Sequence, residues 1–121
     1  MDHIPVHFDI PAEKPEVLAK FYRKLFGWKI ERTEGPVEYW LIYTSAEEGK
    51  GMGGGISKKE DPNQRPINYI LVESVDEYSK KAEKLGGKIT VPKQEILGIG
   101  YLAVALDPDG NVFGLLEAIS P

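Results

Sequence analysis

The chain of 121 residues contains no cysteine. This absence excludes disulfides, thiolate zinc sites and cysteine nucleophiles. The sequence has no run of about 20 apolar residues, which a membrane span requires. Its first residues, MDHIPVHFD, have neither the basic region nor the apolar core of a signal peptide. We therefore expect a cytoplasmic protein with no membrane partner.

An excess of positive charge is also absent. The formal net charge is −4 and the sequence pI is about 5.2. Lysines and arginines are interleaved with acids, as in Lys58-Lys59-Glu60-Asp61, which is typical of a solvated face. Binding to phosphates requires clustered basic residues, so we expect no nucleic-acid partner.

Hydrophobic periodicity divides the first half into clear elements. Strict alternation over residues 6–10 predicts a strand whose apolar side chains pack inward, while His7 and Asp9 point to the other face. Apolar residues at three- and four-residue spacing predict a helix over residues 16–26 that ends at Gly27. Further strands are predicted at 28–31 and 38–45.

A glycine-rich tract, GKGMGGGISKK, covers residues 49–59. It lacks the GxxxxGK[ST] order of a phosphate-binding loop, and it does not join a strand to a helix. Its position predicts instead the last strand of the first half. Glycines weaken a strand but allow a ligand or another backbone to approach closely.

The second half repeats the order of the first. Strands are predicted at 67–72, 88–91, 101–106 and 112–118, with a helix at 74–85. FGWKI and LGGKI match at an offset of 59 residues, which indicates an internal duplication. The prediction is an α+β fold in one domain, residues 1–121, made of two βαβββ modules at about 1–58 and 65–121.

Three segments carry a family resemblance: VHFDIPAEKPEVLAKFYRKLFGWKI, VESVDEYSKKAEKLGGKI and DPDGNVFGLLE. With the paired βαβββ pattern, the chain resembles the vicinal oxygen chelate superfamily of glyoxalase I, bleomycin-resistance proteins and extradiol dioxygenases. The resemblance implies curved mixed sheets that form a cleft for a small organic molecule. It also implies a homodimer.

Metal-using members of that family place four ligands around the cleft. The resemblance maps one onto His7 and one onto Glu117, which suit a divalent ion such as Ni, Zn, Mn or Fe. The other two positions map onto Ile67, which cannot bind a metal and stands beside the weak neutral ligand Asn68, and onto Gly54 or Gly55, which have no donor. His7 and Glu117 are therefore either part of a metal site or a hydrogen-bonded polar pair lining the cleft.

Other candidate site residues follow from strand alternation. Asp9 shares the face of His7, and with Glu117 it could tune His7 for metal-free acid–base chemistry. Aromatic side chains with a polar tip suit an amphipathic ligand. The predicted ligand-binding tyrosines are Tyr39, Tyr43, Tyr69 and Tyr101. The alternative for each of them is a place in the core or in a dimer interface.

Two functions remain in competition. The first is a module without metal that binds a small organic ligand, and the incomplete ligand set favours it. The second is a metal-dependent lyase, isomerase or dioxygenase that uses His7 and Glu117.

Overall fold

The structure is a computed structural model that describes residues 1–47, 49–96 and 100–118. It divides into two compact units. One spans His7–Pro66, and the other combines Met1–Val6 with Ile67–Pro121. Each contains one helix and a mixed sheet, so the predicted α+β fold of two βαβββ modules is confirmed.

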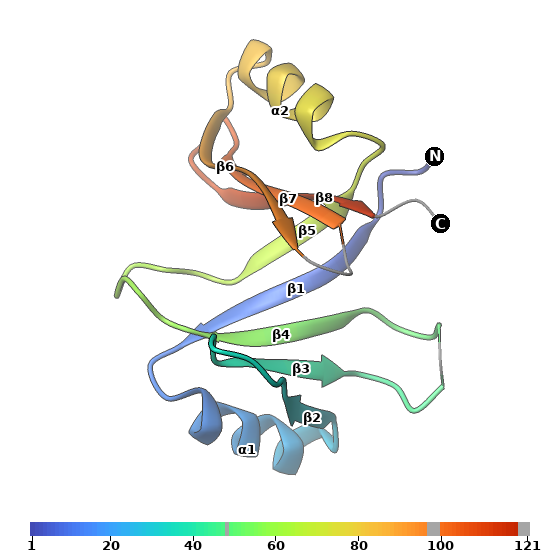
Figure 1. The fold of residues 1–121 in the computed structure, drawn as a ribbon, viewed down its shortest axis with the longest axis vertical. Helices are drawn as coiled ribbons and strands as arrows, with labels where there is room; N and C mark the ends of the chain where they lie inside the picture. The colour runs from blue at the N-terminus through green and yellow to red at the C-terminus, as the bar shows by residue number, and fades with distance from the viewer. Residues whose placement is uncertain (48, 97–99, 119–121) are drawn as a thin grey trace. The chain divides into compact units, whose positions relative to one another are not determined.

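The first module forms a four-stranded sheet in the order β2-β3-β4-β1, in which β1 and β4 are parallel and the other pairs are antiparallel. Its helix α1 packs against β2, β3 and β4 (Figure 1). Pro15 opens the helix, and Gly27 closes it in the left-handed conformation (φ 71°) with its N–H bonded to the Arg23 carbonyl. The elements are β1 Pro5–Ala12, α1 Pro15–Phe26, β2 Lys29–Arg32, β3 Tyr39–Tyr43 and β4 Gly53–Lys58.

Alternation along the strands gives the first module one apolar face. Its buried core is built from Ala19 of α1 and from Ala12, Ile30, Ile42 and Ile56 of the strands. Phe8, Ile10, Trp28 and Trp40 are among the larger side chains that pack around this core. Residues of opposite parity on the same strands, including His7 and Asp9, therefore lie on the face turned away from α1.

The second module repeats this arrangement with strand order β5-β8-β7-β6. Helix α2 packs against β6, β7 and β8, and the Ser74 hydroxyl caps it by accepting from the Glu77 N–H at 3.1 Å. The buried core consists of Val72, Val75, Ala103 and Leu115. The elements are β5 Ile67–Leu71, α2 Val75–Lys84, β6 Lys88–Ile96, β7 Gly100–Leu106 and β8 Val112–Ala118.

Strand β6 is longer than the predicted 88–91, because it continues past Pro92 to Ile96. The strand lies at the edge of its sheet, and its pairing with β7 shifts register on both sides of Val91. Proline has no N–H to donate, and an edge strand with irregular pairing tolerates it. The strand therefore runs through the proline and five residues beyond its predicted end.

The first residues of the chain belong to the second module. The Leu71 N–H donates to the Ile4 carbonyl at 2.9 Å, and His3 Nε2 lies 2.7 Å from Glu73 Oε1. The His3 ring also stands edge-on to Tyr78, with centroids 5.0 Å apart. Hydrogen bonding to His3 holds the pKa of Glu73 below its usual value.

Neither α1 nor α2, the helices found in the described ranges, has the length and apolar character needed to cross a membrane.

Candidate functional site

Three polar side chains meet on the face of the first module that α1 leaves uncovered. His7 Nε2 lies 2.8 Å from the Tyr39 hydroxyl and 3.0 Å from Asp9 Oδ1. The Tyr39 hydroxyl donates to the same Asp9 oxygen at 2.6 Å. His7 and Asp9 come from β1 and Tyr39 from β3, and strand β4 separates the two.

The donors and acceptors of this network assign its hydrogens. Tyr39 gives its only hydrogen to Asp9, so its oxygen accepts from His7 Nε2–H. The same Nε2 lies 3.0 Å from Asp9 Oδ1, so Asp9 faces a donor on each of its two neighbours. The side chains of His7 and Asp9 are 27% and 21% exposed, so a ligand can reach them without unfolding the sheet.

Gly55 makes the network possible. It lies in β4, paired with Asp9 on one side and Leu41 on the other. A Cβ added at Gly55 would stand 1.8 Å from the Tyr39 hydroxyl oxygen, so any side chain there would displace the ring. The glycine tract was expected to let a ligand or another backbone approach closely, but above Gly55 that space is filled by the Tyr39 ring.

Gly53 differs from Gly55. An added Cβ there would meet only the Ile42 carbonyl oxygen, at 3.4 Å, which is ordinary contact. Gly53 pairs with His7, and the β3–β4 register places Tyr43 across from it on the other side. The backbone at Gly53 is therefore the bare part of this face.

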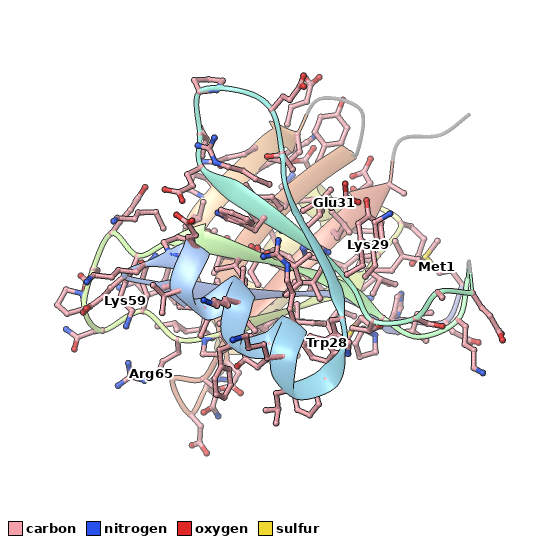
Figure 2. All side chains as sticks on the ribbon, turned by 90° about the horizontal axis from the view of Figure 1, so that it is seen from below. Met1, Trp28, Lys29, Glu31, Lys59 and Arg65 are labelled. Atoms are coloured by element: carbon pink, nitrogen blue, oxygen red, sulfur yellow. The ribbon has the colours of Figure 1, made fainter. Side chains whose placement is uncertain are left out.

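Tyr43 stands at the outer part of the same face and is 45% exposed. The Lys29 ammonium lies 5.3 Å from its ring centroid and 3.0 Å from Glu31 Oε1. Figure 2 shows Lys29 and Glu31 close together on β2. Lys29 donates a hydrogen bond to Glu31, and this bond raises the pKa of Lys29, so the lysine is charged and already paired.

The other two predicted tyrosines lie in the second module. Tyr69 is buried, at 5% exposure, with its ring against Gly114, where an added Cβ would come within 2.2 Å of it. Tyr101 is half-buried beside the α2 core, and Lys93 Nζ lies 4.4 Å from its ring centroid. Lys93 also binds Asp76 at 2.8 Å, and this bond raises the lysine pKa.

Glu117 is occupied by helix α2. Its Oε1 accepts from the Val75 N–H at 2.8 Å, at the first residue of the helix. A carboxylate at a helix N-terminus satisfies an unpaired N–H and is favoured by the helix dipole. Glu117 has the same parity as Leu115, which packs in the α2 core, so it lies on the helix-covered face of its sheet.

The strand registers relate the two modules residue by residue. Pro15 and Val75 are the buried first residues of their helices, 60 positions apart. Ile10 pairs with Ile56, and Ile70 pairs with Leu115. The counterpart of His7 is therefore Ile67, as expected, and the counterpart of Gly55 is Gly114.

This register corrects the expected counterpart of Glu117. Ala12 pairs with Lys58, and one step past the Leu71–Leu116 pair places Glu117 opposite Val72. The counterpart is therefore Lys58 and not Gly54 or Gly55. Lys58 Nζ donates to the Glu13 carbonyl at 2.8 Å, so each of these residues ties a last strand to the start of its module's helix.

The residues present do not fit the metal site that the family resemblance implies. Within the described ranges, no group of three or more His, Asp or Glu side chains is placed to hold a metal ion. In the second module the position that corresponds to His7 holds Ile67, and the paired positions on the two last strands hold Gly55 and Gly114; none of the three side chains offers a donor.

The arrangement offers a carboxylate, an imidazole and a phenol at one point. Such groups can anchor the polar atom of a ligand and can exchange protons with it. Sequence reasoning placed His7 and Asp9 on one face and Tyr39 among the ligand-binding residues, but it did not join the three. The available signal was Gly55, whose missing side chain allows the Tyr39 ring to cross β4.

Comparisons with known proteins agree on one family. The model of the Glyoxalase/Bleomycin resistance protein/Dioxygenase superfamily matches residues 4–115. The anthracycline biosynthesis protein DnrV of Streptomyces peucetius is 26% identical over 126 residues, covering 92% of this chain and 46% of DnrV. A putative glyoxylase, CFP32, of Mycobacterium tuberculosis is 24% identical over 112 residues, covering 90% of this chain and 42% of CFP32.

The chain thus spans about half the length of these curated relatives. Among solved structures, methylmalonyl-CoA epimerase from Mycobacterium tuberculosis superposes with a TM-score of 0.72 at 12% identity, covering 96% of this chain and 88% of the epimerase. A hypothetical protein from Bacillus halodurans C-125 gives 0.75 at 14% identity, covering 100% and 98%. At these identities the likeness establishes the fold alone.

Proposed function

Because the chain belongs to the glyoxalase, bleomycin-resistance protein and dioxygenase superfamily, we propose that it binds a small organic molecule without a resident metal. The binding surface is the face of the first module that carries His7, Asp9 and Tyr39. The observation that carries this proposal is their hydrogen-bonded network, held at 2.6 to 3.0 Å on a half-buried, helix-free face.

Several features support a binding role for this network. A glycine is required at position 55 for Tyr39 to reach its partners, so the backbone is adapted to the network. The two anthracycline biosynthesis proteins among the relatives, from Streptomyces peucetius and Streptomyces strain C5, make an anthracycline the first ligand to test.

Binding would be measured by fluorescence titration of an anthracycline against the wild-type protein, Tyr39→Phe and His7→Gln. Loss of a hydrogen bond to a charged group should weaken binding about tenfold in each variant. Tyr22→Phe is the matched control, because Tyr22 packs on the α1 side of the sheet, and its dissociation constant should equal that of wild type. Equal affinity in all four proteins would refute the proposed site.

The metal-dependent alternative has its own measurement. Elemental analysis of protein purified without chelator, followed by titration with Ni²⁺, Zn²⁺, Mn²⁺ and Fe²⁺, should give no stoichiometric metal. Near-stoichiometric metal that disappears in both His7→Ala and Glu117→Ala would reject the metal-free proposal.

The resemblance also leads us to propose a homodimer. The chain is about half as long as its curated relatives, so two copies would match one relative in size. Light scattering coupled to size exclusion should give twice the 13.5 kDa chain mass. A monomer at all concentrations would contradict it.

A further inference from the structure

The Asp9 carboxylate divides its two oxygens unequally. Oδ1 accepts from the Tyr39 hydroxyl at 2.6 Å and lies 3.0 Å from His7 Nε2. No hydrogen bond to Oδ2 is present from any of the described residues. Because an ionised carboxylate is an acceptor only, its remaining capacity can be met by a hydrogen-bond donor and by no other polar group.

The charge around Asp9 also favours a donor. The Tyr39 hydroxyl donates its hydrogen to Asp9, and His7 Nε2 lies within hydrogen-bond distance of both Tyr39 and Asp9, so these two groups are already engaged with Asp9. The lysine found elsewhere on this face, Lys29, is paired with Glu31 on β2. A ligand carboxylate placed beside Asp9 would meet like charge in a partly desolvated site, which is unfavourable.

Next to this acceptor the floor is flat. Gly53 presents bare backbone, with His7 on one neighbouring strand and Tyr43 on the other. Asp9 is two residues along β1 from His7, which is about 7 Å. A two-ring aromatic system spans a similar length, so a ring lying over Gly53 can bring a substituent to Asp9 while its edge contacts Tyr43.

On the basis of the proposed function, we propose that the ligand is a planar aromatic compound with a neutral hydroxyl group, seated over Gly53 and donating to Asp9 Oδ2. Carboxylate-bearing analogues are excluded by Asp9. Aromatic ligands with acceptors only are bound weakly, since they leave Oδ2 without a donor.

Three probes that differ in one substituent test the donor rule. They are naphthol, methoxynaphthalene and naphthoate, each substituted at the same ring position, with affinities measured by calorimetry at neutral pH. Wild-type protein should bind naphthol about tenfold more tightly than either analogue. Naphthoate or methoxynaphthalene binding as tightly as naphthol would overturn the proposal.

Two variants test separately the hydrogen bond to Asp9 and the contact of the aromatic ring with Gly53. Asp9→Asn should reduce the preference for naphthol over naphthoate about tenfold, because the repelling charge is gone. Gly53→Val should weaken all three probes together, because its side chain fills the floor while the preference for a donor persists. An unchanged preference in Asp9→Asn would reject the hydrogen bond to Asp9. Unchanged affinities in Gly53→Val would reject the position of the ring over Gly53.

Failure of this inference is distinguishable from failure of the proposed function. An anthracycline that binds through Tyr39 while none of the naphthalenes binds would retain the function and reject the planar-donor rule. Binding of naphthol that is insensitive to both Asp9→Asn and Tyr39→Phe would place the ligand elsewhere and reject both.

Discussion

The two modules share a scaffold but differ in the polarity of one sheet face. In each module a tyrosine ring covers a glycine of the last strand, with Tyr39 over Gly55 and Tyr69 over Gly114. In the first module the ring ends in a hydrogen-bonded network with His7 and Asp9. The position corresponding to His7 in the second module is Ile67, so the duplicated backbone was retained while its polar chemistry was confined to one copy.

The largest expected effect is the loss of stability when the glycine beneath each tyrosine is replaced by alanine. Gly114→Ala forces a methyl group into the buried Tyr69 ring and should lower the free energy of unfolding by about 3 kcal/mol. Gly55→Ala displaces Tyr39, which is only partly buried, so we expect a smaller loss of about 1 kcal/mol. Urea unfolding of both variants measures the difference.

Ligand binding should show the reverse order. Gly55→Ala separates Tyr39 from His7 and Asp9, so binding should fall even though stability changes little. Gly114→Ala should retain affinity at temperatures where the protein is folded. If both variants lost the same free energy of unfolding, the burial of the tyrosine ring would not determine the size of that loss.

A smaller effect concerns the residues that tie each last strand to its helix. Glu117→Ala leaves the Val75 N–H at the start of α2 without its acceptor and should cost about 1 kcal/mol, as loss of a helix cap does. Lys58→Ala removes an exposed bond to the Glu13 carbonyl and should cost less than about 0.5 kcal/mol. Thermal unfolding monitored by circular dichroism measures both.

The same pair distinguishes the roles proposed for Glu117. Glu117→Gln keeps an acceptor oxygen for Val75 and should recover most of the lost stability. If Glu117→Ala and Glu117→Gln were both fully stable, the carboxylate would not serve α2, and a role in a ligand or metal site would regain support.

The smallest effect is a pH dependence in the second module's β7–β8 turn. Asp107 Oδ1 accepts from the Asp109 and Asn111 N–H groups, each at 2.9 Å, and these bonds lower the pKa of Asp107 below its usual value of 3.8. The stabilisation is complete above the unfolded-state pKa and is lost as pH falls through the lower folded-state pKa. Asp107→Asn keeps an acceptor but not the charge.

The melting temperature of wild type should therefore fall more steeply than that of Asp107→Asn between about pH 5 and pH 2. Parallel curves would show that this carboxylate is not linked to folding. No comparable change is expected for Asp61→Asn, a surface turn residue that follows the first module.

Much of this architecture could be predicted because it depends on local pattern. Alternation in 6–10 placed His7 and Asp9 on one face, and the helical spacing before Gly27 defined α1. The prediction of 88–91 was too short for β6, because sequence alone does not show that a strand lies at an edge, where Pro92 is tolerated.

The candidate site required information that no local pattern contains. Tyr39 and His7 are 32 residues apart, and their contact depends on a glycine in a third strand. Glu117 was assigned by family motif, whereas its face depends on strand register: one position of offset decides between the helix side and the open side. Tyr69 and Tyr101 likewise could not be placed until that register was known.

The pairing of the first six residues with the second module has a consequence for the order of folding during synthesis. Ile4 accepts from Leu71, and His3 binds Glu73, so residues 1–6 must wait for partners that are made about 70 positions later. The first module, residues 7–66, has all its own strands by then. A nascent chain stalled after Pro66 would therefore hold a complete first module with an unpaired leading segment, and contacts of such long range close slowly.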